Sequence, residues 1–259
     1  MSDRIPKELL YRFRDLIYER YGIHYIPAKI EILRNKLEKI QVREGDLAGF
    51  LARVMSGDER AERSLLKEVT VGHTFFFRES AHLTLLVNDI MAKKLVVPHI
   101  WCAASSTGEE PWSIAITLLE RGLRNFVIVA SDVNADSLRV MHRGVYNEGK
   151  FQNTPNRIKQ AYFRDEGNGA YSVQKTLRKY LKIKRLNLHD QIEFERPFDY
   201  VFCRNVMIYF DDAGRRKVIR NLVNNLYRGG LLFVGHTEAL LDIPASLKKE
   251  AQSVFRRTP

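Results

Sequence analysis

Two adjacent carboxylates follow a run of small residues near the middle of this 259-residue chain. An apolar stretch at 100–103 leads into Ala104-Ser105-Ser106-Thr107-Gly108, and Glu109 and Glu110 come next. A connection of this kind between a strand and a helix places small residues where a ligand approaches the backbone. Carboxylates at a helix start repel anions, so we expect a cationic ligand such as the ammonium and sulfonium of S-adenosylmethionine. The alternatives are a plain tight connection and, for one of the two glutamates, ordinary pairing with the helix dipole.

A third carboxylate, Asp132, ends the next apolar run at 127–131. An acidic side chain at this position of a parallel sheet accepts hydrogen bonds from ribose hydroxyls, so Asp132 is a second candidate cofactor contact. The alternative role is capping of the following helix, for which Asn134 is better placed.

Alternating apolar segments around these residues predict the elements that position them. We expect helices at 82–94, 110–121 and 135–142, strands at 96–103, 127–131, 200–203 and 231–235, and a helix at 214–227 ending at the turn Arg228-Gly229-Gly230. Such alternation is typical of an α/β fold with a doubly wound, mostly parallel sheet. Cys102 and Cys203 lie inside two of the strands, where we expect packing thiols rather than a disulfide or a metal site.

The chain is expected to contain two domains. Residues 1–72 show helical periodicity at 9–21, 30–40 and 59–69 and form an N-terminal helical domain. Residues 73–259 form the second domain, with a small antiparallel β-subdomain inserted at about 147–186. Gly167-Asn168-Gly169 is a hairpin-type turn inside that insertion.

The net charge of +11 is unevenly distributed along the sequence. Residues 150–185 hold ten Lys and Arg against two acidic residues, whereas residues 1–70 are nearly balanced. The basic segment favours an acidic partner, and the alternative is a solvated face that aids solubility. The apolar runs are shorter than the roughly 20 residues of a membrane span, and the first residues lack a secretory signal, so we expect a cytoplasmic protein.

Several motifs occur in order over nearly the whole chain. They are Thr-Phe-Phe-Phe-Arg-Glu at 74–79, Ser-Thr-Gly-Glu-Glu-Pro-Trp-Ser at 106–113, Asn187-Leu188, Phe-Cys-Arg-Asn-Val-Met-Ile-Tyr-Phe at 202–210, and Gly-His-Thr-Glu at 235–238. In these motifs the chain resembles the chemotaxis receptor glutamate O-methyltransferase family, of CheR type.

The resemblance implies a class I, Rossmann-like S-adenosylmethionine-dependent methyltransferase that releases S-adenosylhomocysteine. It implies a cofactor site formed by Thr74, Arg78, Glu110, Asp132, Asn187, Leu188, Asn205 and Val206. The implied partner is the cytoplasmic helical bundle of a methyl-accepting chemotaxis receptor, with neither nucleic acid binding nor membrane insertion. Relatives that dock on a receptor's tether peptide use the inserted sheet; the insertion here is short, which leaves tether docking open.

A glutamate acceptor is already ionised near neutral pH, so catalysis of its methylation consists mostly of positioning. Arg78 and Tyr209 are the catalytic candidates: a guanidinium matches a carboxylate, and Tyr209 offers a hydroxyl. The alternative for Arg78 is a surface ion pair with Glu79 or Glu68. Gly72 stands where many members of the resembled family carry Asn, which removes one possible hydrogen bond to the cofactor.

Other roles for these residues and two other functions stay open at this stage. Asn187 and Asn205 could cap turns, and His236 is expected to be structural because the chemistry needs no base. The basic charge suggests a nucleic-acid methyltransferase, but no Asn-Pro-Pro-Tyr or Pro-Cys element follows any strand. Gly72 supports a non-catalytic sensor or scaffold, against which the retained Arg78, Glu110 and Asp132 argue.

Overall fold

The computed structural model describes residues 5–238 and 243–258, and the chain forms two compact units. The first unit comprises Met1–Val71 together with Ile208–Arg215, and the second comprises Gly72–Met207 with Arg216–Pro259. The segment 208–215, which the expected boundaries assign to the second domain, therefore clusters with the N-terminal helices.

Helices form the first unit. They are α1 (Lys7–Tyr21), the short 3-10 helix η1 (Pro27–Lys29), α2 (Ile30–Glu44), α3 (Leu47–Met55) and α4 (Glu59–Val69). The three expected helical stretches are present, while α3 was not predicted. Asp46 begins α3 by accepting the N–H groups of Ala48 and Gly49, and Phe50 and Val54 on its inner face are fully buried.

The second unit is built on a seven-stranded sheet with the order β6-β2-β1-β7-β8-β10-β9. These strands are β1 (His99–Ala103), β2 (Val127–Asp132), β6 (Leu181–Arg185), β7 (Phe198–Cys203), β8 (Leu226–Val234), β9 (Leu247–Ala251) and β10 (Val254–Arg257). The first five run parallel, and β10 is antiparallel to both of its neighbours. The expected mostly parallel α/β fold is confirmed.

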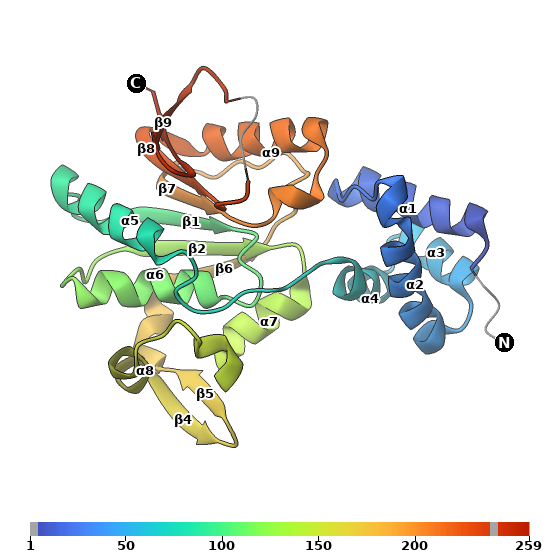
Figure 1. The fold of residues 1–259 in the computed structure, drawn as a ribbon, viewed down its shortest axis with the longest axis horizontal. Helices are drawn as coiled ribbons and strands as arrows, with labels where there is room; N and C mark the ends of the chain where they lie inside the picture. The colour runs from blue at the N-terminus through green and yellow to red at the C-terminus, as the bar shows by residue number, and fades with distance from the viewer. Residues whose placement is uncertain (1–4, 239–242, 259) are drawn as a thin grey trace. The chain divides into compact units, whose positions relative to one another are not determined.

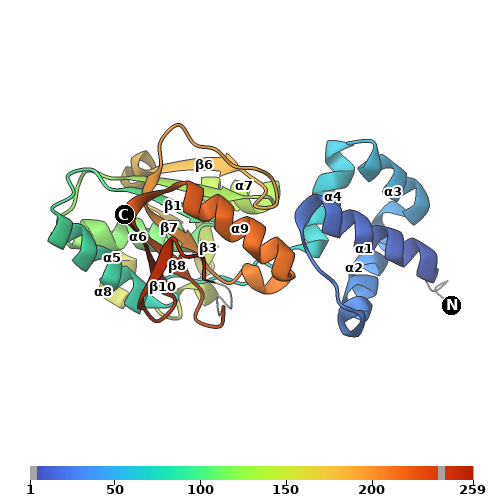
Figure 2. The same ribbon diagram turned by 90° about the horizontal axis from the view of Figure 1, so that it is seen from above.

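Helices cover both faces of this sheet. They are α5 (Ser80–Lys93), α6 (Glu109–Glu120), α7 (Ala135–Arg143) and α9 (Asp212–Asn224), whereas α8 (Asn156–Tyr162) lies beside the small sheet described below. Figure 1 shows α6 on one side of the sheet and α9 on the other, and Figure 2 shows the same layers from above. The core between the layers includes the fully buried Trp101, Trp112 and Phe202. Cys102 and Cys203 are buried free thiols whose pKa burial raises, as expected for packing residues.

A second, three-stranded antiparallel sheet is formed by the part of the chain between strands β2 and β6 of the main sheet. It has the order β3-β5-β4, from β3 (Val145–Asn147), β4 (Phe163–Gly167) and β5 (Ala170–Val173). The expected hairpin turn joins β4 to β5, and Gly167, Asn168 and Gly169 all have positive φ there, at 82°, 52° and 71°. Strand β6, included in the expected insertion at 147–186, instead pairs in parallel with β2 in the large sheet.

The expected helix at 214–227 is too long at its end, because α9 stops at Asn224 and strand β8 begins at Leu226. The intervening Asn225 donates its side-chain amide to Ile192 O and Asn221 O, both at 2.8 Å, and its carbonyl accepts Phe198 N at 2.8 Å. These bonds draw the chain into register with β7. The predicted turn at 228–230 thus lies within β8. Strands β9 and β10 were not predicted.

Candidate functional site

Most of the predicted cofactor residues follow the carboxyl ends of the parallel strands. Glu110 follows β1, Asp132 ends β2, Asn187 and Leu188 follow β6, and Asn205 follows β7. Strand β1 lies between β2 and β7, so the chain's connections reverse direction beside it. Open α/β sheets bind ligands at this kind of switch point.

The backbone at this edge of the sheet adopts left-handed conformations that L-residues rarely take. After β1, φ is 54° at Ala104, 49° at Ser106 and 96° at Gly108, and after β7 it is 60° at Asn205. Such conformations cost energy and persist only where surrounding bonds enforce them. The loops that carry the predicted site are therefore held by specific contacts.

Asp132 is one of these contacts. Its Oδ2 accepts the N–H of Ser106 and its Oδ1 accepts the N–H of Asn134, both at 2.8 Å. Asn134 caps α7, as expected, by accepting the N–H groups of Asp136 and Ser137. Burial raises the pKa of Asp132 above its usual value, although the backbone hydrogen bonds act in the opposite direction. The carboxylate thus joins the ends of β1 and β2.

The two adjacent glutamates have different environments. Glu109 is fully buried, and its carboxylate accepts a hydrogen bond from Thr107 Oγ1 at 2.6 Å and lies 3.0 Å from Lys150 Nζ. Glu110 forms an ion pair with Nε of Arg204. The structure therefore assigns a packing role to Glu109 and leaves Glu110 as the candidate for a cationic ligand.

Arg204, immediately after β7, connects three segments of the candidate site and was not among the predicted residues. Its side chain is 4% exposed. Besides Glu110 it bonds the carbonyl oxygen of Arg78 at 2.9 Å and Glu79 Oε2 at 3.3 Å. Burial lowers the pKa of Arg204, but the two glutamates outweigh it and hold the pKa above its usual value. The available signal was a charged residue directly after a buried strand.

The loop before α5 carries Thr74 and Arg78, and the short 3-10 helix η2 (Glu148–Phe151), which follows β3, holds this loop in place. Lys150 Nζ donates to Thr74 O at 2.8 Å, and Phe76 N donates to Lys150 O at 3.0 Å. The ring of Phe76 is fully buried and packs against Phe151, with ring centroids 4.8 Å apart. Phe76 is thus a core residue that anchors the loop.

Arg78 itself is half-buried. Its Nη1 donates to the carbonyl of His73 at 3.0 Å, and its guanidinium carbon lies 5.6 Å from the centroid of the Phe75 ring. Glu79, one expected alternative partner of Arg78, is instead paired with Arg204. The predicted role of Arg78 stays a prediction.

Asn187 and Leu188 lie next to Asp132 in the fold, because Leu186 N donates to Asp132 O at 3.1 Å. The Asn187 side chain accepts His189 N and donates to Asp190 Oδ1, each at 3.1 Å, which closes a local turn. The turn-capping alternative for Asn187 is therefore realised, and its contact with the cofactor stays a prediction.

Asn205 and Val206 form the half-buried turn after β7. Asn205 N donates to Glu238 Oε2 at 2.8 Å. Tyr209, the second catalytic candidate, belongs to the first unit, where its carbonyl accepts His24 N at 2.8 Å. The predicted role of Tyr209 stays a prediction.

Comparison with known proteins identifies the family of this chain. The family model described as "CheR methyltransferase, SAM binding domain" matches residues 72–255. The chain belongs to the CheR methyltransferase family. It is 31% identical to chemotaxis protein methyltransferase 2 of Vibrio cholerae, over 88% of this chain and 84% of the relative. It is 33% identical to the chemotaxis protein methyltransferase of Escherichia coli (strain K12), over 94% of this chain and 88% of the relative.

As a CheR methyltransferase, the protein uses S-adenosylmethionine as the methyl donor. The residue types at the carboxyl ends of the parallel strands fit this cofactor. Glu110 and Asp132 are carboxylates, the type of group that pairs with an ammonium and accepts hydrogen bonds from ribose hydroxyls, and the left-handed turns at Ser106 and Asn205 lie in the loops beside them. S-adenosylmethionine, when bound, supplies an electrophilic methyl group.

One cluster in this CheR protein has the donor types of a metal site. Among the described residues, Glu79, His82 and His236 bring ligand atoms within 4.8 Å of one another. Burial lowers the pKa of His82 to about 4, so the ring is neutral at physiological pH. The guanidinium of Arg204 already lies 3.3 Å from Glu79 and supplies a positive charge there. These contacts favour an ion-pair and ring-packing cluster.

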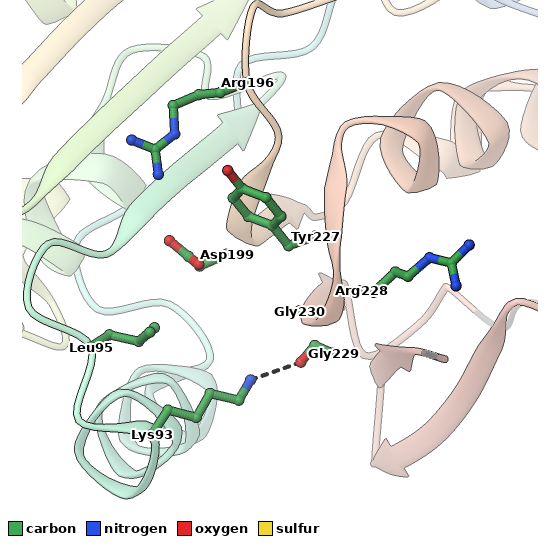
Figure 3. A pocket seen from close by; sticks show the side chains of 8 residues that line it. All are labelled: Lys93, Leu95, Arg196, Asp199, Tyr227, Arg228, Gly229 and Gly230. Carbon is green, nitrogen blue, oxygen red and sulfur yellow. Dashed lines mark hydrogen bonds between the residues drawn. The ribbon is translucent and has the colours of Figure 1, made fainter.

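A cavity of about 340 Å³ opens at the other end of the strands (Figure 3). It is lined by Asp199 near the start of β7 and by Tyr227 at the start of β8. Lys93 on its wall is bound to Gly229 O at 2.7 Å, and Arg228 points away from the other labelled side chains. None of the predicted cofactor residues lines it, so we assign it no role in methyl transfer.

Much of the basic segment at 150–185 is engaged within the fold. Arg157 pairs with Glu120, Lys159 with Glu148, and Arg164 with Glu166. Arg178 donates to the carbonyls of His142 and Arg143. These residues therefore contribute less free positive charge than the sequence suggests. In the described part of the chain, no helix is long and apolar enough to cross a membrane.

Proposed function

We propose that this protein methylates glutamate side chains on the cytoplasmic helical bundle of a chemotaxis receptor and works in the cytoplasm. The observation that carries the proposal lies at the edge of the sheet where the parallel strands have their carboxyl ends. There, bonds from Arg204 to Glu110 and from Ser106 to Asp132 fix both carboxylates in place. The names of the relatives, which are chemotaxis protein methyltransferases, support a receptor as the acceptor.

The residues of the proposed site act by binding and orientation. Glu110 binds the ammonium end of the cofactor and Asp132 its ribose, with Thr74, Asn187, Leu188, Asn205 and Val206 as further contacts. Arg78 orients the acceptor carboxylate, since its fork of N–H donors matches two carboxylate oxygens. A glutamate is ionised at neutral pH, so no residue has to remove a proton. Tyr209 is a further candidate for contact with the acceptor.

The test is transfer of tritiated methyl groups to receptor-containing membranes. We expect label that is released as methanol by mild alkali, because methyl esters of glutamate are alkali-labile and N-methyl groups are not. Arg78→Ala should lower the rate of transfer by about a hundredfold through lost positioning. The matched control is Arg139→Ala on α7, whose side chain is 57% exposed and paired with Asp136.

Alkali-resistant label, or label on added DNA or RNA in place of the receptor, would overturn the proposal. An unchanged rate in Arg78→Ala would remove Arg78 from the proposed mechanism and leave the acceptor assignment standing.

A further inference from the structure

The turn after β8 ends in a buried carboxylate that no role so far explains. Glu238 is 6% exposed. Its Oε2 accepts the N–H of Asn205 at 2.8 Å and the N–H of Gly235 at 2.7 Å, and its Oε1 accepts the N–H of Met207 at 2.7 Å. One side chain therefore satisfies backbone donors on two separate loops.

Two of these donors lie in the loop that carries the predicted cofactor contacts Asn205 and Val206. Asn205 has a left-handed backbone, which is costly without local support. Hydrogen bonds to a carboxylate are roughly twice as strong as those between neutral groups. Glu238 thus supplies the support for an otherwise unfavourable turn.

Gly235 completes the arrangement by having no side chain. Its φ is outside the left-handed region, so space alone excludes a larger residue. A Cβ at this position would lie 2.6 Å from Asn205 Nδ2, 2.8 Å from Glu238 Oε2 and 2.9 Å from Asn205 N. The Asn205 amide and the Glu238 carboxylate occupy this space instead.

The pairing of the strands does not depend on these bonds. Strands β7 and β8 are in parallel register from Tyr200–Leu231 to Cys203–Val234, before the turn begins. Loss of the Glu238 carboxylate should therefore disturb the loop far more than the sheet.

We propose that Glu238 is a positioning residue for S-adenosylmethionine binding, which acts by fixing the Asn205–Met207 turn and does not touch the cofactor itself. The inference rests on the proposed assignment of Asn205 and Val206 to the cofactor site. Gly235 serves the same purpose by leaving room for the Asn205 side chain.

The experiment compares Glu238→Gln with wild type by calorimetric titration with S-adenosylhomocysteine. Glutamine keeps the size of the side chain but turns one acceptor into a donor that faces backbone N–H groups. Because the buried amide donor would be left without an acceptor, we expect binding to weaken about tenfold or more. Gly235→Ala, which displaces the Asn205 amide, should weaken binding in the same direction. The matched control is Glu250→Gln on β9, whose side chain is 42% exposed and paired with Arg256.

Two further readouts separate positioning from a general loss of stability. Hydrogen exchange at the Asn205 and Met207 amides should become faster in Glu238→Gln, with exchange in β7 unchanged. In methyl transfer, KM for S-adenosylmethionine should rise and kcat should change little. A variant that is less stable yet binds S-adenosylhomocysteine as tightly as wild type would overturn the role of Glu238 alone. Failure of the wild type to bind would instead overturn the cofactor site, and the inference with it.

Discussion

Asp58 in the first unit and Asp132 in the second unit each accept hydrogen bonds from two backbone N–H groups. Asp58 accepts the N–H groups of Arg60 and Ala61 at the start of α4, and Asp132 accepts those of Ser106 and Asn134. Their pKa values nevertheless move in opposite directions. The hydrogen bonds from Ala61 and Arg60 lower the pKa of Asp58, whereas burial raises the pKa of Asp132.

The difference teaches that the same type of hydrogen bond serves two purposes: Asp58 caps one helix, and Asp132 links two separate segments. At the start of α4, the Asp58 carboxylate caps the helix. At the edge of the sheet, burial opposes ionisation of the Asp132 carboxyl and raises its pKa, and groups placed at such a cost are typical of functional sites. The following predictions, from the largest effect to the smallest, test whether the sheet edge differs from the rest of the molecule in this way.

Removal of the buried guanidinium should have the largest effect. Arg204→Ala leaves Glu79 and Glu110 without their buried partner, so we expect a loss of about 3 to 5 kcal/mol in unfolding free energy. Trp101 and Trp112, both in the second unit, report urea unfolding of that unit by fluorescence. Arg139→Ala, at an exposed ion pair, should change it by less than about 0.5 kcal/mol. Equal effects of the two substitutions would contradict the comparison.

Acid should destabilise the second unit through His82. The pKa of His82 is about 4 in the folded protein, because of burial, against 6.5 in the unfolded chain. The unfolded chain binds more protons between these values, so stability is full above pH 6.5 and falls as the pH drops toward 4, by up to about 3 kcal/mol. Urea unfolding at several pH values measures this slope, and His82→Gln should have a shallower one. A slope that the substitution leaves unchanged would exclude His82 as its cause.

Asp132→Asn should weaken binding of S-adenosylhomocysteine by about tenfold or more, because the amide places a donor against the N–H groups of Ser106 and Asn134. Asp58→Asn, the same change at the helix cap of α4, should leave binding unaltered. Calorimetric titration of both variants decides this. If both lose affinity equally, the two carboxylates do not differ in function.

The smallest expected effect is the difference in titration between the two aspartates. NMR titration of the carboxyl carbons should give a midpoint below 3.8 for Asp58 and above 3.8 for Asp132. Stability from Asp58 is present above pH 3.8 and is lost as the pH falls through its folded pKa. For Asp132 the sign is reversed, since the folded state holds the proton more tightly than the unfolded chain. If both titration midpoints lay on the same side of pH 3.8, the two aspartates would not differ as stated above.

Local signals in the sequence were sufficient for much of the fold. The apolar runs that became β1, β2 and β7, the cap at Asn134 and the Gly167–Gly169 hairpin all depend on neighbouring residues, and the structure confirms them. Asp132 was predicted as a cofactor contact because it is an acidic residue at the end of an apolar strand. The roles assigned to the site residues stay predictions.

Features that depend on distant partners could not be predicted. Arg204 meets Glu110 and Glu79 from 94 and 125 residues away, and Glu238 meets Asn205 from 33 residues away. Helix α9 ends early because Asn225 bonds Ile192 and Phe198, which also lie outside any local window. Side-chain bonds to remote backbone leave no periodic pattern in a sequence.

The anchoring of Phe76 has a consequence for synthesis on the ribosome. Its ring is enclosed by those of Tyr146, Phe151 and Phe163, whose centroids lie within 5.0 Å of its own. These three residues are synthesised at least 70 residues later than Phe76. The carbonyl oxygen of Arg78 accepts a hydrogen bond from Arg204, which is synthesised 126 residues later. A nascent chain forms local contacts first and distant ones only after their partners have left the exit tunnel. The loop before α5, which carries Phe76 and Arg78, should therefore be among the last parts of the molecule to take its final position.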